Sequence, residues 1–165
     1  MNLCPRLAHP KRLWASFGAM IVCLCVIQFL VFRFDLILLD MLSDPAQVKS
    51  AILSMSVQQL RIHIGITATL DVALPLAYGC FFVGVAYRFF PGRAGFLSLP
   101  AVFCVPVDLF EGIVQLLVML NAVDWTSLKA VLTPLKLLLI GISTLITVAG
   151  LMRGLVHKLR GIPQD

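Results

Sequence analysis

Long apolar runs separated by short polar intervals dominate the chain. A helix that crosses a bilayer needs about 20 mostly apolar residues, and four runs reach that length. We predict membrane-spanning helices over residues 13–32, 62–87, 94–120 and 128–152. The pattern therefore indicates an all-α protein, a four-transmembrane-helix bundle in which residues 1–165 form a single integral membrane domain.

The first apolar run follows three basic residues, Arg6, Lys11 and Arg12. A signal peptide would have an apolar region of about 7 to 15 residues and small residues at a cleavage site. The run over residues 13–32 is longer and has no such site. We therefore predict a membrane helix that is retained.

The interval between the first two runs carries a helix start. Asp44 stands at an N-cap position, Pro45 at the first helical position and Gln47 at the third. Apolar residues then recur at helical spacing. We predict a short amphipathic helix over residues 45–55 in the first external loop, which either lies on the membrane surface or folds over the mouth of the bundle.

Composition agrees with a membrane protein. The chain is 60% hydrophobic and 13% charged, whereas soluble domains have about 45–50% apolar and about 25% charged residues. The net charge of +5 comes from basic residues that flank the apolar runs rather than forming one basic face, which argues against nucleic acid as a partner. The partners that this composition predicts are membrane lipids.

Lysines and arginines are unequally divided between the two sides of the predicted membrane. The N-terminal segment, the interval after the second run and the C-terminal tail carry eight, whereas the other two intervals carry four, among them Lys129. The positive-inside rule therefore predicts that both termini are cytoplasmic.

Two carboxylates, Asp108 and Glu111, lie near the centre of the third run. An ionisable side chain at the bilayer centre costs at least about 2.5 kcal/mol, so such residues usually face a bundle interior and have partners there. Their spacing of three residues places both on one helix face. Asp71 in the second run and Lys136 in the fourth fall at nearly the depth of Glu111, so we expect these three in one layer and Asp108 about one turn deeper.

These residues predict a polar pocket that opens outward under the first loop. We assign Asp108 and Glu111 as a catalytic pair that shares a proton, because three carboxylates near one lysine cannot all be ionised at low dielectric. Polar residues on the same helix faces are assigned to ligand binding: Asp71, Tyr78, Gln115, Lys136 and Thr67. Two alternatives stay open, namely an ion-pair cluster that only fixes helix register and a Lys136 side chain that reaches toward the membrane surface.

Motifs for metal, nucleotide or serine-hydrolase chemistry do not occur in the sequence, including H-E-x-x-H, G-x-S-x-G and the P-loop. The five cysteines are dispersed, mostly within apolar runs, and show no paired spacing. We therefore expect no metal and no cofactor. Acid/base chemistry stays open, so the sequence does not decide whether the protein is an enzyme.

Three groups of residues carry a resemblance to a known family: Asp71-x-x-x-Pro75-Leu76-x-Tyr78-Gly79, Pro106-x-Asp108-x-x-Glu111, and Lys136. Together they resemble an uncharacterised family of small bacterial four-helix integral membrane proteins, which implies a location in the bacterial inner membrane. That family would have Asn where this chain has Gly112, which leaves no amide at that position. The four spans with inward acids and Glu111-x-x-x-Gln115 are also similar to the sterol-isomerase and sigma-2-receptor group, which implies an amphipathic amine or a sterol as ligand.

The principal interpretation is an integral membrane protein whose buried pocket of acids and lysine binds an amphipathic small molecule or lipid, with acid/base chemistry as an option. One alternative is a proton-linked small transporter, which would need a homo-oligomer because four helices leave little room for a pathway. Another is a non-catalytic accessory or assembly subunit of a membrane complex. The first two depend on charged residues inside the bundle, and the third does not.

Overall fold

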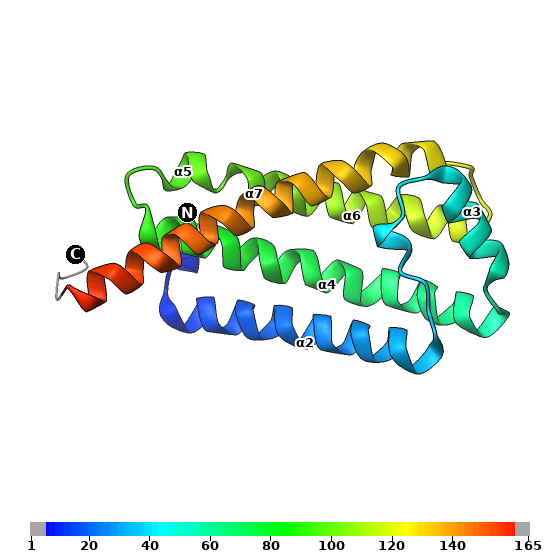
Figure 1. Cartoon of the computed structure of the whole chain (residues 1–165), viewed down its shortest axis with the longest axis horizontal. Coiled ribbons are helices and arrows are strands. Elements are labelled where there is room, and N and C mark those ends of the chain that lie inside the picture. The colour runs from blue at the N-terminus through cyan, green and yellow to red at the C-terminus, as the bar shows by residue number, and fades with distance from the viewer. Residues whose placement is uncertain (1–5, 161–165) are drawn as a thin grey trace.

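Helices make up nearly all of the structure. The computed structural model describes residues 6–160, in which no strand occurs. The chain begins and ends toward one end of an elongated bundle, and α3 lies at the opposite end (Figure 1). The elements in chain order are α2 (Pro10–Phe34), the short 3-10 helix η1 (Leu39–Met41), α3 (Pro45–Ser54), α4 (Val57–Phe89), α5 (Ala94–Leu97), α6 (Leu99–Met119) and α7 (Thr126–Leu159).

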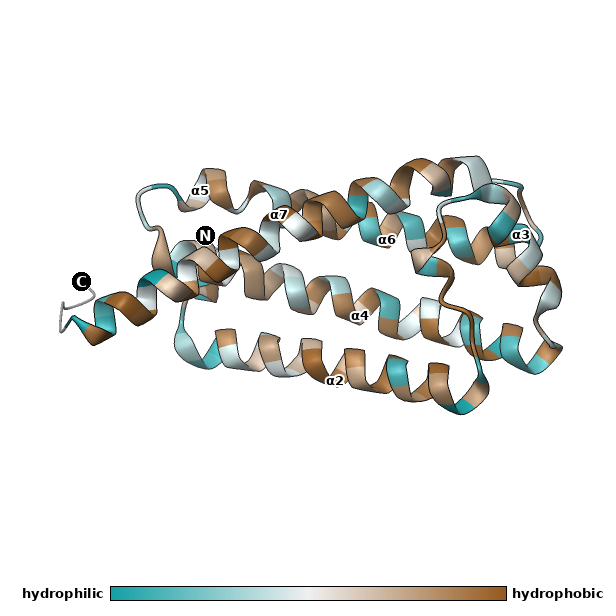
Figure 2. Ribbon diagram, viewed as in Figure 1, coloured by the Kyte–Doolittle hydropathy of each residue, from teal (hydrophilic) through white to brown (hydrophobic). Residues whose placement is uncertain are grey.

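Four helical segments among the described residues are long and apolar enough to cross a membrane: α2, α4, α5 with α6, and α7. This confirms the predicted all-α bundle and identifies a multi-pass membrane protein. The helices α4 and α7 exceed their predicted bounds, with 33 and 34 residues. At 1.5 Å per residue they are about 50 Å long, against a hydrocarbon core of about 30 Å, so their ends reach the headgroup regions. Figure 2 shows hydrophobic residues along most of α2 and polar residues toward its ends.

The predicted surface helix begins where the sequence places it. The Asp44 side chain accepts a hydrogen bond from the Ala46 amide at 3.0 Å, and Pro45 is the first helical residue. At the start of α4, Ser56 and Gln59 form a reciprocal capping box. These caps satisfy amides that the first helical turns leave without partners, which fixes both helix starts.

The helix α4 lies at the centre of the packing and contacts α2, α6 and α7, whereas α2 packs mainly against α4. Two glycines of α4 allow close approach. A Cβ atom at Gly79 would overlap the Val105 side chain of α6, and one at Gly84 would lie 2.7 Å from the Leu7 carbonyl oxygen. Small residues at such crossings let helices approach closely, which is how helices associate where no hydrophobic force drives them together.

The loop between α2 and α4 covers the end of the bundle opposite the termini. Leu39 of η1 and Ala51 of α3 are buried against Met119 at the end of α6. Lys49 of α3 forms an ion pair with Asp124 at 2.6 Å, and its hydrogen bond holds the pKa of the Asp124 carboxyl below its usual value. The structure therefore places the surface helix over the bundle end, which was one of its two predicted positions.

Candidate functional site

Glu111 of α6 is buried among basic and polar side chains of α7. Its Oε1 atom lies 2.6 Å from Lys129 Nζ, and its Oε2 atom lies 2.5 Å from Lys136 Nζ. The Thr133 hydroxyl also donates a hydrogen bond to Oε1. Glu111 is 1% exposed and Lys129 is fully buried. The carboxylate is therefore held between two ammonium groups away from solvent.

Lys136 connects this carboxylate to a second one. Its Nζ atom lies 3.2 Å from Asp108 Oδ1, and the Tyr78 hydroxyl donates to Asp108 Oδ2 at 2.6 Å. The Cys104 sulfur lies 3.3 Å from the same hydroxyl. Polar contacts thus run without interruption from Lys129 through Glu111, Lys136 and Asp108 to Tyr78, and they join α7, α6 and α4.

Helical spacing explains why these side chains meet. Asp108 and Glu111 are three residues apart on α6, and Lys129, Thr133 and Lys136 are separated by four and three residues on α7. Each set therefore lies on one face of its helix, and the two faces oppose each other. A buried charge is tolerated only when it is paired and hydrogen-bonded. The two carboxylates and two lysines meet that requirement among themselves.

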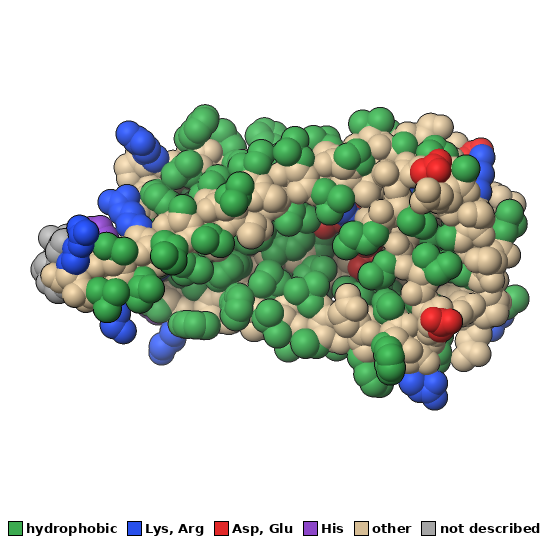
Figure 3. All heavy atoms as spheres, in the orientation of Figure 1, with side chains coloured by type: hydrophobic (Ala, Val, Ile, Leu, Met, Phe, Trp, Pro, Cys, Tyr) green, Lys and Arg blue, Asp and Glu red, His purple; other side chains and the backbone are tan. Residues whose placement is uncertain are grey.

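A hollow of about 260 Å³ lies beside this cluster, between α2 and α7. Figure 3 shows acidic and basic side chains deep in this hollow, with hydrophobic side chains around it. Asp40, Asp71, Asp108, Tyr78 and Lys136 line its polar part. Apolar side chains of three helices make up much of the remaining wall, including Met20, Leu24, Leu74, Phe82, Leu137 and Ile140. A smaller hollow of about 110 Å³ adjoins it and shares Asp40 and Asp71.

Carboxylates outnumber lysines around this space. Asp40 and Asp71 form no ion pair among the described residues, whereas Asp108 and Glu111 share Lys136, and Glu111 also has Lys129. Asp71 lies beside the Thr67 hydroxyl. Four carboxylates thus stand against two lysines. The two carboxyl groups without an ion pair are those of the aspartates that face the hollow.

Thr67 and Gln115 are buried between α4 and α6. The Gln115 side-chain amide donates to the Thr67 hydroxyl at 3.2 Å. Neither residue is among those lining the two hollows. Their hydrogen bond links the two helices that carry Asp71 and Glu111, and their assignment to ligand binding stays a prediction.

Two expectations about the site differ from the structure. We counted Lys129 with the charges of an external interval, but it is fully buried and pairs with Glu111. We also expected the pocket to open outward under the first loop. The loop does line the hollow through Asp40 and Met41, but it packs over the bundle end with Leu39 and Val48 buried, and the hollow lies at the side, between α2 and α7 (Figure 3). The physical reason is that the loop is apolar enough to seal the end.

Other expectations are partly resolved. Lys136 does not reach toward the membrane surface, because it is buried and paired with both acids. Asp108 and Glu111 both contact its ammonium group, and their sharing of a proton stays a prediction. Pro75 lies inside α4, lines the hollow and does not interrupt the helix.

Sequence reasoning missed three residues of this region: Lys129, Thr133 and Asp40. The signal for Lys129 was available, since it precedes Lys136 by seven residues, or two helical turns, and so shares its face. Thr133 lies between them on that face. Asp40 lies in a 3-10 helix within an irregular loop, and no periodicity there indicates which way a side chain points.

These features define a helical multi-pass membrane protein with a charged interior and a lateral hollow. Among residues 6–160, no group of three or more His, Cys, Asp or Glu side chains is arranged to hold a metal ion. Comparison of the chain with protein-family models, curated proteins and solved structures gave no match.

Proposed function

We propose that the protein binds an amphipathic molecule with a cationic head group in the hollow between α2 and α7. The observation that supports this most directly is that Asp40 and Asp71 line the hollow and form no ion pair among the described residues, while the nearby Lys136 is paired with Asp108 and Glu111. An ionised carboxylate in such a place needs a counter-charge. A ligand ammonium group would supply it.

The rest of the cluster would position the head group. Asp108 is already oriented by Tyr78 and Lys136 at 2.6 and 3.2 Å. Its carboxylate therefore has partners within the protein and lines the hollow in a fixed position. A head group entering the hollow would therefore meet Asp40, Asp71 and the Tyr78 hydroxyl. Acid/base chemistry on the bound molecule would need Asp108 or Glu111, and this catalytic role stays a prediction.

The shape of the hollow favours entry from the membrane. Its apolar wall comes from α2, α4 and α7, and the loop between α2 and α4 seals the bundle end. An amphipathic molecule that is already in the bilayer would reach the carboxylates sideways between α2 and α7. Ligand sites commonly have a mostly apolar lining with a few polar groups that fix orientation, as this hollow does.

The proposal is tested with dodecylamine added to the full chain in dodecyl maltoside micelles at pH 7. A ligand that binds only the folded state raises the unfolding temperature, so dodecylamine is expected to raise it in a saturable manner and dodecanol is not. The change of Asp71 to Asn removes one unpaired carboxylate. We expect it to raise the apparent Kd for dodecylamine about tenfold, because each 1.4 kcal/mol corresponds to a factor of ten.

Asp35→Asn is the matched control, because Asp35 is exposed, lies outside both hollows and has a φ of 50° that Asn tolerates. It should leave dodecylamine binding unchanged. If dodecanol stabilises the protein as well as dodecylamine, or if Asp35→Asn and Asp71→Asn have equal effects, the carboxylates do not select a cation and the proposal is wrong.

A second candidate, proton-linked transport, is favoured by the uninterrupted polar contacts from Lys129 to Tyr78. We expect liposomes containing the protein to dissipate an imposed pH gradient faster than protein-free liposomes if this role holds. Asp108→Asn should reduce that flux to the protein-free rate, because Asp108 joins Lys136 to Tyr78. Equal flux in liposomes with and without protein would reject transport and leave the binding role in place.

We further propose that the protein resides in a bacterial inner membrane with both termini in the cytoplasm, so that the end covered by α3 faces outward. The excess of lysine and arginine near the termini supports this orientation.

A further inference from the structure

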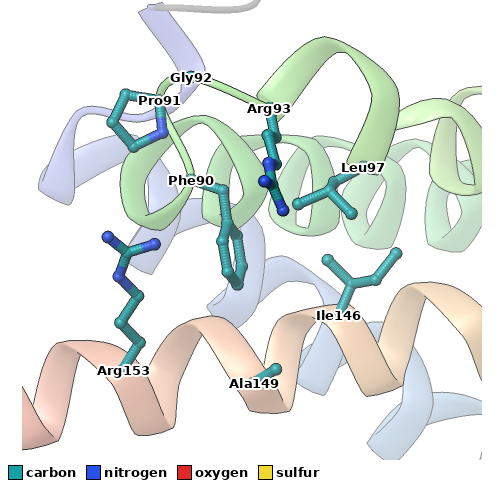
Figure 4. Close-up of a pocket in the computed structure, with 8 residues that line it drawn as sticks. All are labelled: Phe90, Pro91, Gly92, Arg93, Leu97, Ile146, Ala149 and Arg153. Carbon is teal, nitrogen blue, oxygen red and sulfur yellow. The ribbon is translucent and has the colours of Figure 1, made fainter.

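Another, larger hollow of about 570 Å³ lies near the end of the bundle that carries the chain termini. The turn after α4 and the short helix α5 form one side of it, with Phe90, Arg93 and Leu97, and α7 forms the other, with Ile146 and Arg153. Figure 4 shows the Phe90 ring between the two arginine side chains, with Leu97 and Ile146 on the Arg93 side. Basic groups from two separate segments therefore converge on one apolar space.

No carboxylate within residues 6–160 neutralises the two guanidinium groups. Neither Arg93 nor Arg153 forms an ion pair among the described residues. The acidic residues of the described chain all fall within 35–71 and 108–124, which lie away from this end. Arg153 is instead held by a cation–π contact, with its guanidinium carbon 5.7 Å from the centre of the Phe90 ring. The positive charge at the hollow is thus available to an external anion.

The position of the hollow along α7 matches a membrane interface. Arg153 lies 27 residues after Thr126, or about 40 Å along the helix at 1.5 Å per residue. A bilayer with its headgroup regions is about 40–45 Å thick, so Arg153 lies at the headgroup level opposite α3. Ile146 lies two turns closer to the membrane centre, about 10 Å away along the axis. The hollow is therefore basic at headgroup depth and apolar at acyl-chain depth.

We propose that this hollow binds an anionic phospholipid, with its phosphate held by Arg93 and Arg153, which flank the Phe90 ring (Figure 4), and an acyl chain along Leu97 and Ile146. Guanidinium groups bind phosphate oxygens through paired, charge-assisted hydrogen bonds. Basic pockets between membrane helices are suited to lipid headgroups. Free inorganic phosphate would leave the apolar part of the hollow unoccupied, whereas a phospholipid would occupy both the basic and the apolar parts.

The test is native mass spectrometry of the full chain in dodecyl maltoside, titrated with phosphatidylglycerol. We expect one phosphatidylglycerol molecule to be retained at low lipid concentration, and phosphatidylcholine to be retained far more weakly. The double variant R93Q/R153Q should raise the apparent Kd for phosphatidylglycerol between about 10- and 100-fold, because hydrogen bonds to charged groups are individually worth about a factor of ten or more.

K158Q/R160Q is the matched control, because it removes the same charge from the same end of α7 outside the hollow. It should bind phosphatidylglycerol as the parent chain does. A second variant, Ala149→Phe, keeps every charge and fills part of the apolar wall, so it should also weaken binding. Both arginines are exposed, and unfolding temperatures without lipid will establish that each variant is folded.

Several results would overturn the proposal. If K158Q/R160Q lost as much phosphatidylglycerol binding as R93Q/R153Q, a general attraction of anions to the basic end of the bundle would explain the result. Equal retention of phosphatidylcholine would remove the role of the anionic headgroup. If inorganic phosphate displaces phosphatidylglycerol at equal concentration, or if Ala149→Phe has no effect, the apolar part of the hollow is not occupied and the ligand is a free anion.

Discussion

Replacing Glu111 with Leu is expected to destabilise the protein by about 3–5 kcal/mol, because it leaves a buried charge without its counter-ion. Lys129 is fully buried, and Glu111 is its carboxylate partner at 2.6 Å. After the substitution only the Thr133 hydroxyl, 3.5 Å away, remains as a polar contact for the ammonium group. The measurement is the free energy of unfolding in mixed micelles of dodecyl sulfate and dodecyl maltoside.

A second substitution separates the loss of pairing from the loss of packing. Replacing Lys129 with Met in the Glu111→Leu background removes the unpaired charge, and apolar replacements of a buried pair are often nearly neutral. The double variant is therefore expected to recover most of the lost stability. The control is Lys49→Met, which breaks an ion pair of the same 2.6 Å length at the surface and should have little effect because its partner stays in water. A double variant as unstable as Glu111→Leu would contradict this account.

Gly79→Ala is expected to destabilise the protein by about 1–3 kcal/mol, because overpacking forces side chains or helices out of place. A methyl group at this position would overlap Val105 of α6. Valine in a helix has one strongly preferred rotamer, so Val105 cannot easily move aside. The helices α4 and α6 would have to separate, and this would disturb the adjacent hydrogen bond from Tyr78 to Asp108.

Gly65→Ala is the matched control on the same helix, since no atom lies within 4 Å of the added methyl group. It should be neutral or slightly stabilising, because Ala has the higher helix propensity. Val105→Ala should restore part of the stability of Gly79→Ala by making room for the methyl group. Both effects are read from unfolding temperatures and from dodecylamine binding. Equal losses from Gly79→Ala and Gly65→Ala would mean that contact with Val105 does not limit the spacing of the helices.

The proposed amine site and the buried ion pairs lie at different ends of one cluster of charged residues. Glu111 and Lys129 are closed off from the hollow, so we expect their substitution to change stability first. Asp40 and Asp71 face the hollow, so we expect their substitution to change binding first. Measuring both quantities on the same variants therefore distinguishes a binding site from an ion-pair cluster that only fixes helix register.

The amino-acid sequence by itself determined which segments cross the membrane and where the short helix begins. Hydrophobic length and cap residues such as Asp44 and Pro45 act locally, so they can be read without knowledge of neighbours. The sequence also placed Asp108 and Glu111 on one helix face, because the period of the helix is fixed.

Only the tertiary structure decided what that face meets. Lys129 lies three residues into α7, where a charge is typical of a helix end in water, and it is buried at the end of α7 against which α6 and α3 pack. Asp40 reaches the hollow from an irregular segment that has no period. The sideways opening depends on how α2 and α7 are spaced around α4. Helical periodicity determines the direction of a side chain relative to its own helix, whereas the opposing residue depends on the rotation and register of a second helix.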